Sequence, residues 1–439
     1  MGLLLAAVVV SPVDAQMIVS PPGAVGGIFG GKAPVDARRS SQKLSVTADA
    51  STGEDTVPSE SLTPGDPTPR ILRNRATTAA FGAQYSAGRI GKLFEAGGGG
   101  FLNRESSRPD QLNGANGQVR MTFGTRTGMT LASSLLYQPL TVQSTTIGTG
   151  SSTGTSGPAA SNDASMVGPP NSVNRQNWLT SQGAVTFFRN ATPRRRFDGT
   201  VSAWSWRPLE GTGFTNSSLR ASGQYSSRIS PLNLFYLRYN LDRIHQAGVA
   251  QFETDTTLHS PSVALQLQRR YTPVRSLLAD FEFGVTQVLF DGRLTASSQA
   301  TVPVGSAQLQ WVASRTWRLT GGVRRDVMVL NGFTNQPFAS VQATGELAGT
   351  LSRRLRTQVS SSFVRGRGVV DQQSDFDSAT HMVRVQYGVA NWCGLFASYS
   401  YYQQTFDLLQ STPNAALANA GRHAVRGGVS LWLPLFGSF

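Results

Sequence analysis

Apolar and polar side chains alternate along most of this chain, from about Leu44 to Phe439. Clear examples are Phe281-Glu-Phe-Gly-Val285 and Val383-Arg-Val-Gln-Tyr387. A period of two predicts β-strands with one apolar and one polar face. A tilted strand of roughly 9 to 11 residues crosses a bilayer, and a transmembrane barrel turns its apolar face to lipid and its polar face to the lumen. The pattern therefore predicts an all-β chain that forms a transmembrane antiparallel up-and-down β-barrel.

The number of alternating segments predicts a barrel of 16 to 18 strands. Eighteen candidate strands are 43–50, 77–87, 91–102, 117–124, 130–139, 177–189, 196–207, 216–227, 233–242, 261–270, 276–287, 305–313, 316–327, 337–348, 354–365, 379–389, 394–404 and 422–433. The connections between them alternate between nine long and eight short ones. We therefore expect short periplasmic turns, long extracellular loops and both termini in the periplasm. The alternative is a soluble or β-helical all-β protein, although Greek-key crossovers would mix the loop lengths.

The first residues have the features of an export signal. Gly2–Val10 is an apolar run that is too short to span a membrane, and Val13-Asp-Ala15 fits signal-peptide cleavage. We expect a signal peptide at 1–15, a flexible periplasmic leader rich in Gly and Pro at 16–41, and the outer-membrane β-barrel at 42–439. No Lys or Arg precedes the apolar run, so a buried N-terminal strand is the alternative.

The net charge of +14 comes almost wholly from arginine, because only Lys32, Lys43 and Lys92 are lysines. Such a charge raises the question of nucleic-acid binding. The arginines are spread over strands and turns rather than gathered on a basic helix, so we expect no nucleic acid as a partner. Arginines in short turns such as Ser352-Arg-Arg-Leu355 favour contact with the phosphates of membrane lipids and lipopolysaccharide. Docking of a periplasmic partner is the alternative.

Assigning the more apolar face of each strand to lipid leaves charged and aromatic side chains facing the lumen. The pore-lining candidates are Arg120, Arg220, Arg238, Arg318, Arg324, Arg356, Arg384, Arg426, Asp280, Glu282 and Asp326, with Asp198 and Glu346 as further inward acids. The aromatic lumen candidates are Trp178, Trp204, Trp206, Tyr236 and Trp432. The excess of arginine favours anions. Alternatively, the charges pair across strands and keep the barrel rigid. The rings either stack on sugars or fill the wall near the rim.

The remaining features bear on loops and chemistry. The longest connection, 140–176, is rich in Gly, Ser and Thr and cannot bury a core, so we expect disorder outside the barrel rather than a constriction inside it. His245 and His259 fall in one predicted loop, whereas His381 and His423 begin strands. With a single cysteine, Cys393, the chain shows no catalytic or metal-binding motif. We expect no enzyme activity and no cofactor or metal.

The repeated unit of a tight polar turn and an alternating strand, as in Trp392-Cys-Gly-Leu-Phe-Ala-Ser-Tyr-Ser-Tyr401, resembles Gram-negative outer-membrane β-barrel proteins of the porin type. So does the ending Val429-Ser-Leu-Trp-Leu-Pro-Leu-Phe-Gly-Ser-Phe439, although Pro434 and Gly437 depart from simple alternation. The resemblance implies passive diffusion of small polar or anionic solutes, and a final strand ending in Phe439 that the barrel-insertion machinery reads. Two alternatives stay open: export of an anionic exopolysaccharide, and a closed structural or adhesive barrel that binds partners through its outer loops.

Overall fold

The computed structural model describes residues 41–59, 70–89, 92–105, 111–139, 146–148, 177–208, 215–247, 253–292, 295–330, 337–369, 375–407 and 419–436. Its elements are strands: β1 (Ser41–Ser59), β2 (Arg70–Arg89), β3 (Lys92–Glu105), β4 (Gln111–Gly124), β5 (Thr127–Pro139), β6 (Thr146–Gly148), β7 (Asn177–Thr192), β8 (Arg195–Pro208), β9 (Thr215–Arg228), β10 (Leu234–Ala247), β11 (Glu253–Arg270), β12 (Ser276–Gly292), β13 (Thr295–Val312), β14 (Trp317–Leu330), β15 (Pro337–Ser352), β16 (Leu355–Gly368), β17 (Asp375–Ala390), β18 (Cys393–Asp407) and β19 (Asn419–Phe436). In the described ranges, no helix is long and apolar enough to cross a membrane.

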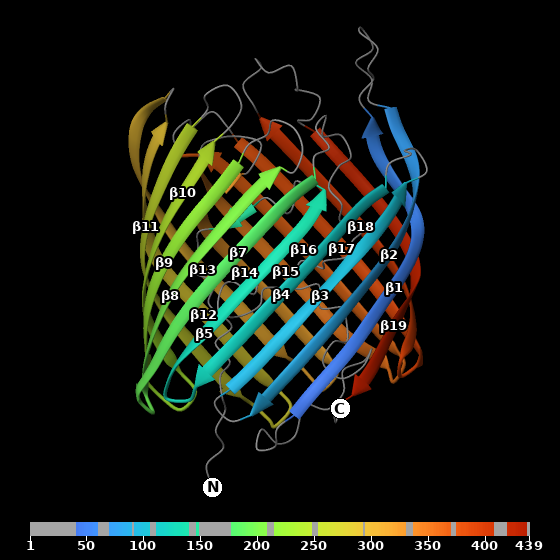
Figure 1. Cartoon of the computed structure of the whole chain (residues 1–439), viewed down its shortest axis with the longest axis horizontal. Helices are drawn as coiled ribbons and strands as arrows, with labels where there is room; N and C mark the ends of the chain where they lie inside the picture. Colours follow the sequence, from blue (N-terminus) through green and yellow to red (C-terminus); the bar gives the residue numbers. More distant parts are fainter. Residues whose placement is uncertain are drawn as a thin grey trace.

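Eighteen of these strands form one closed antiparallel barrel (Figure 1). Each strand pairs with its neighbour along the chain, β5 pairs with β7, and β1 pairs with both β2 and β19. The pairing of β1 with β19 closes the barrel and satisfies the edges that an open sheet would expose. The predicted all-β, up-and-down fold and the upper value of the predicted strand number are confirmed.

The two ends of the barrel differ in their connections. Eight short connections, from 90–91 to 391–392, lie at the end where β1 begins and β19 ends, and we call it the short-turn end (Figure 1). The nine remaining connections lie at the opposite end, the long-connection end. The predicted alternation of long and short connections holds for most of the chain. It is wrong between β12 and β13, where a long connection at 288–304 was expected, because the two strands extend until only residues 293–294 separate them. The predicted signal peptide and the predicted leader at 16–41, except Ser41 in β1, lie outside the described residues.

The strands extend further than the sequence pattern predicts. Strand β10 pairs with β11 as far as Ala247 and Glu253. His245 and His259 therefore lie in strands, and the prediction that they share a loop is wrong. The error arises because Ile244 and Leu258 are apolar residues on the inward face, where the pattern predicts polar ones. They interrupt the alternation of apolar and polar residues on β10 and β11.

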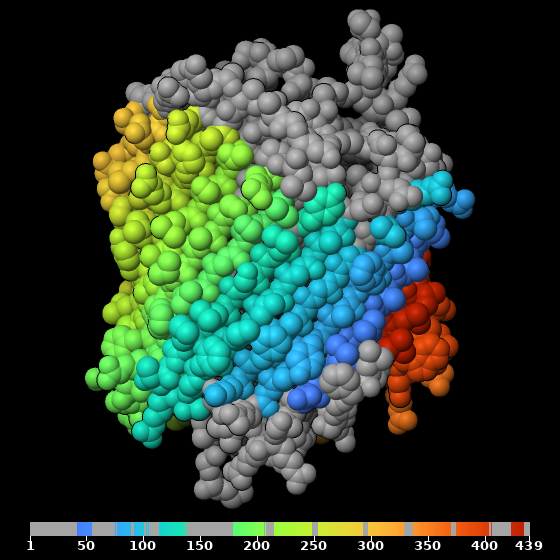
Figure 2. Space-filling view, in the orientation of Figure 1, coloured from blue at the N-terminus to red at the C-terminus, as the bar shows by residue number. Residues whose placement is uncertain are grey.

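The outer surface of the barrel is an apolar band. Outward side chains such as Phe81, Phe187 and Phe283 are more than half exposed, at 63%, 58% and 66%. Between them along the strands lie inward residues that are buried, such as Asp280 and Glu282 beside Phe283 on β12. Figure 2 shows β2 to β5, β7 and β8 as tilted stripes packed side by side across one face of the barrel.

The wall changes character between β13 and β14. These strands pair only from Gly305–Val312 to Arg325–Arg318. Nearer the long-connection end, β13 continues to pair with β12, whereas Met328–Leu330 of β14 pair with β6. We call this region the overlapping seam: residues 295–304 of β13 and 326–330 of β14.

Packing shows how the overlapping seam is closed. Val327 follows the parity of the exposed Leu319 and Val323, yet it is fully buried. It packs in a cluster with inward-facing side chains of β10 to β13, namely Ile244, Leu258, Val288 and Val302. The end of β14 therefore lies inside the β10–β13 wall, with an apolar layer between them. The prediction that the polar face of each strand lines the lumen is wrong at this end of the barrel, where the inner face is apolar.

Candidate functional site: the inner wall of the barrel

On the inner face of β9 and β10, one arginine forms an ion pair with one aspartate. Arg220 and Asp242 are direct partners in the β9–β10 ladder, and their side chains form an ion pair at 2.5 Å. Ser218 donates a further hydrogen bond to Asp242 at 3.0 Å. The Asp242 side chain is only 3% exposed. A buried carboxylate needs such partners, so Arg220 is a structural cation as much as a lumen charge.

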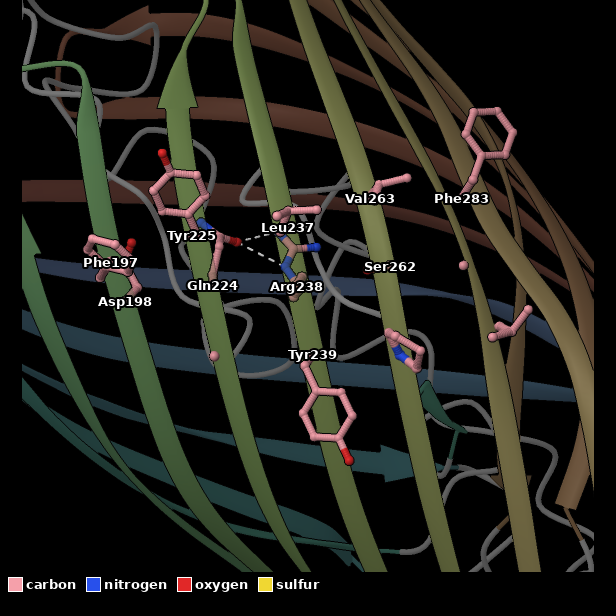
Figure 3. A pocket seen from close by; sticks show the side chains of 14 residues that line it. Phe197, Asp198, Gln224, Tyr225, Leu237, Arg238, Tyr239, Ser262, Val263 and Phe283 are labelled. Atoms are coloured by element: carbon pink, nitrogen blue, oxygen red, sulfur yellow. Dashed lines mark hydrogen bonds between the residues drawn. The ribbon is translucent and has the colours of Figure 1, made fainter.

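A second paired group lies on the same side, nearer the short-turn end. Arg238 donates to Gln224 at 2.6 and 2.9 Å (Figure 3). It also forms an ion pair with Glu282 at 3.2 Å. Ser262 also donates to Glu282, at 2.6 Å. Tyr236 donates to Gln266 at 3.2 Å, and Gln266 in turn donates to Asp280 at 3.4 Å. This network spans β9 to β12. In it Arg238 neutralises Glu282, and Asp280 accepts a hydrogen bond from the Gln266 amide.

The inner face of β8 adds one more pair. Arg196 donates to both oxygens of Asp198, at 2.8 and 2.9 Å. Asp198 was predicted to face inward. Arg196, which begins the predicted strand 196–207, was not among the candidates, although it shares the inward parity of Asp198. Together, these contacts support the alternative of paired, rigidifying charges for the wall formed by β8 to β12.

The inner face of β14 to β19 is different. Its described side chains include five arginines and two acids: Arg318, Arg324, Arg356, Arg384, Arg426, Asp326 and Glu346. Asp326 forms an ion pair with Arg324 at 2.7 Å. Arg426 donates to Thr78 at 3.0 Å. We call Arg318, Arg356 and Arg384 the basic wall.

One acid serves the whole basic wall. Glu346 accepts a hydrogen bond from Gln358 at 3.0 Å and lies among Arg318 and Arg356. The Arg384 guanidinium stands over the ring of Phe396, 4.2 Å from its centre, and its Nε has no hydrogen-bond partner among the described residues. Arg318 and Arg356 each follow a short turn, so the basic wall lies toward the short-turn end. It presents the donors and positive charge of three arginines to the lumen, against the single described acid Glu346.

The other predicted candidates are scattered. Arg120 lies on β4, opposite Glu95 in the β3–β4 ladder and apart from both charged walls. Trp204 is on β8, and Trp432 is buried on β19. The side chains of Trp178 and Trp206 lie outside the described ones. Within the described part, the rings of Tyr236 and Trp432 lie on opposite walls, since β10 and β19 are nine strands apart in the ring. A role for any of these residues in solute passage stays a prediction.

The longest connection departs from the prediction of disorder at its three described residues. Thr146–Gly148 form β6 and pair with Leu330–Met328 of β14. The flanking strands β5 and β7 lie eight and seven places from β14 around the ring, almost across the barrel. Residues 146–148 therefore lie at the overlapping seam, on the far side of the lumen from the strands that flank them. The register of β6 depends on this distant partner, which the Gly/Ser/Thr-rich sequence does not reveal.

No family model and no curated protein sequence matches this chain. Solved structures with a similar course include Pseudomonas aeruginosa OpdQ, with 12% identity, 90% of this chain and 99% of that chain covered, and a TM-score of 0.46. For Acinetobacter baumannii OccAB3 the identity is 12%, the match covers 89% of this chain and 99% of that chain, and the TM-score is 0.45. For Pseudomonas aeruginosa OprD the identity is 10%, the match covers 90% of this chain and 96% of that chain, and the TM-score is 0.43. Such values assign no function to the chain.

Proposed function

We propose that this protein is an outer-membrane, porin-like channel for passive diffusion of small polar or anionic solutes. The excess of arginine on β14 to β19, in a barrel whose other charged wall is internally paired, is the observation that carries the proposal. A barrel of roughly 16 to 18 strands is wide enough for an aqueous channel. Rings of arginine lower the electrostatic barrier for anions.

The two charged walls of the lumen would act differently on a passing solute. On β8 to β12 the arginines already bind carboxylates, so they attract a passing solute weakly. On the basic wall, guanidinium donors remain for a carboxylate or phosphate, and the planar fork of arginine suits both. A solute would exchange water for these donors in a few steps without any covalent chemistry. The four histidines stand on the outward parity of their strands, so the proposal includes no enzyme activity.

The location follows from the outer surface. A tall apolar band around an even-stranded closed barrel is what a bilayer requires, because lipid cannot satisfy an open sheet edge. The short turns would face the periplasm and the long connections the exterior, where lipopolysaccharide is the neighbouring lipid. Recognition of the last strand by the barrel-insertion machinery belongs to this proposal, and Phe439 itself lies outside the described residues.

Single-channel recording in a planar bilayer with a salt gradient tests the proposal. We expect steady conductance steps and a reversal potential that indicates anion preference. Replacing Arg356→Glu and Arg384→Glu together should move the reversal potential toward cations. The matched control, Arg189→Glu with Arg269→Glu, makes the same change in charge on the outward parity of β7 and β11 and should leave selectivity unchanged. Equal shifts in both variants would contradict a selective role for the basic wall.

A closed structural barrel is the second candidate, and a specific observation favours it. Strand β6 and the buried apolar cluster around Leu258 and Val327 occupy lumen space at the long-connection end. Absence of any conductance from protein that migrates as a folded, heat-modifiable barrel would support this candidate. Export of an anionic polysaccharide lacks comparable support, because the described aromatic side chains form no continuous track.

A further inference from the structure

The outer face of β8 to β12 carries an apolar groove of about 840 Å³. One side is a row of outward side chains that are partners in successive ladders, namely Phe197, Tyr225, Leu237, Val263 and Phe283 (Figure 3). The neighbouring row contains Gly223, Tyr239, Pro261 and Val285. Gly223 leaves the groove open there, since a Cβ at this position would meet nothing within 4 Å.

The groove climbs from the short-turn end into the middle of the apolar band. Phe197 is two residues from the start of β8, whereas Phe283 is seven residues from the start of β12. A row perpendicular to tilted strands must rise around the barrel in this way. The groove is therefore oriented with one end near the barrel rim and the other among the most exposed hydrophobic side chains.

Two arginines stand at the lower end of this groove. Arg189 on β7 is the direct ladder partner of Phe197, and so continues the first row by one strand. Arg195 lies two residues before Phe197 on β8, on the same face. Both side chains are exposed, and among the described residues neither forms an ion pair. The groove thus joins an apolar channel to a pair of available cations.

Elsewhere on the outer face, arginines do have acidic partners. At the long-connection end, outward arginines have acidic partners: Arg365 pairs with Asp377 at 3.6 Å and Arg367 with Asp375 at 3.4 Å. At the short-turn end the eight connecting segments carry repeated arginines and contain no Asp or Glu. The charge there is left for an anion that is external to the chain.

We propose that the groove binds one anionic glycerophospholipid, with an acyl chain along the row from Phe197 to Phe283 and the phosphate at Arg189 and Arg195. The acyl chain gains van der Waals contacts along the groove, and a phosphate near a membrane surface is attracted by each arginine. The proposal rests on the membrane location and not on solute transport. It assigns the lipid to the leaflet at the short-turn end.

A second copy of the chain is a poorer occupant. In one membrane all copies have the same orientation, so a neighbour would have to offer acids at the same height as Arg189 and Arg195. The described outward acids, including Asp255, Asp375 and Asp377, lie at the opposite end and face arginines of their own. Charge complementarity therefore favours a lipid.

Native mass spectrometry of the delipidated barrel in detergent is the test, with dioleoyl phosphatidylglycerol and dioleoyl phosphatidylcholine as probes. We expect one retained phosphatidylglycerol per barrel. It should bind on the order of tenfold more tightly than phosphatidylcholine, because two surface arginines act on the anionic headgroup. Equal retention of both lipids would overturn the assignment of the phosphate site.

Two variants separate the parts of the site. Gly223→Leu should fill the groove and abolish retention of either lipid, whereas Gly183→Leu adds the same side chain to the outward parity of β7, also into open space, and should not. Arg189→Gln with Arg195→Gln should remove the preference for phosphatidylglycerol, and the turn variant Arg353→Gln with Arg354→Gln should keep it. Heat-modifiable migration confirms folding of each variant.

Contrary outcomes are distinct. Lipid retention that survives Gly223→Leu would place the lipid elsewhere and overturn the proposal. A dimer or trimer mass that Gly223→Leu dissociates, without lipid loss, would assign the groove to another copy of the chain. Single-channel conductance should be the same for Gly223→Leu and the native protein, so failure of the lipid site and failure of the channel proposal are recognised separately.

Discussion

Arginine plays two different roles in this barrel, and the difference lies in its immediate partners. Arg220 neutralises the buried Asp242 on the adjacent strand. Arg384 stands over Phe396, and its Nε has no described hydrogen-bond partner. Removing one member of a buried pair leaves an uncompensated charge, whereas removing a cation that serves no buried acid leaves none. The same residue type therefore has opposite consequences for folding at the two positions.

Replacing Arg220→Gln should destabilise the barrel by about 3 kcal/mol, because Asp242 would stay buried without its cation. Arg384→Gln, the matched control, should cost less than about 1 kcal/mol, the usual size of a cation–π contact. Urea unfolding followed by tryptophan fluorescence measures both. Equal stability of the two variants would contradict the division into structural and available arginines.

The assignment of faces gives a second prediction at this scale. Val385 is on the outward parity of β17, flanked by the inward Arg384 and Gln386. Val385→Arg should reduce folding into vesicles, costing roughly 2 to 4 kcal/mol if the residue lies near the bilayer midplane. Val385→Leu keeps the side chain apolar and should fold normally. The folded fraction is measured by heat-modifiable migration, and normal folding of Val385→Arg would refute the assigned face.

At the scale of elements, the alternation of apolar and polar residues is enough to predict a strand and its two faces where that alternation is regular. Strand β17 alternates from Val383 to Val389, and its faces are readable from the sequence there. Strand β10 ends later and β11 begins earlier than predicted, because Ile244 and Leu258 face an apolar layer inside the barrel. Strand β6 is unreadable for another reason: three residues of a Gly/Ser/Thr-rich connection acquire strand structure only from the distant β14.

Strand β6 gives a prediction about the lumen. Proline cannot donate a hydrogen bond to a ladder, so Ile147→Pro should break the pairing with Val329. If the connection then leaves the mouth of the barrel, single-channel conductance should rise while heat-modifiable migration stays the same. Thr153→Pro, in the same connection but outside β6, is the control. Unchanged conductance in Ile147→Pro would show that β6 does not restrict the path.

At the scale of the whole molecule, the barrel is closed by two different means. Around most of the ring, backbone ladders continue along the strands, and the β1–β19 pairing completes the circle. In the overlapping seam the β13–β14 ladder stops, and apolar packing takes its place. Each arginine could be assigned to a face from its own sequence, but the charge balance of the two walls depends on register. Arg220 meets Asp242, and Arg238 reaches Glu282 two strands away, through ladder positions that alternation alone does not fix.

The overlapping seam should consequently be the place where the barrel opens first. Leu258 is fully buried against Val327, and deleting such a side chain costs about 2 to 5 kcal/mol in a packed core. Because hydrogen bonds to β13 are missing there, we expect Leu258→Ala to act locally: the amides of residues 327–330 should exchange hydrogen faster, while those of β17 and β18 keep their protection. Leu395→Ala, on the outer face of β18, is the control and should leave the seam unchanged. Uniformly faster exchange in Leu258→Ala would mean that the apolar cluster stabilises the barrel as a whole and that the seam is no weaker than the rest of the wall.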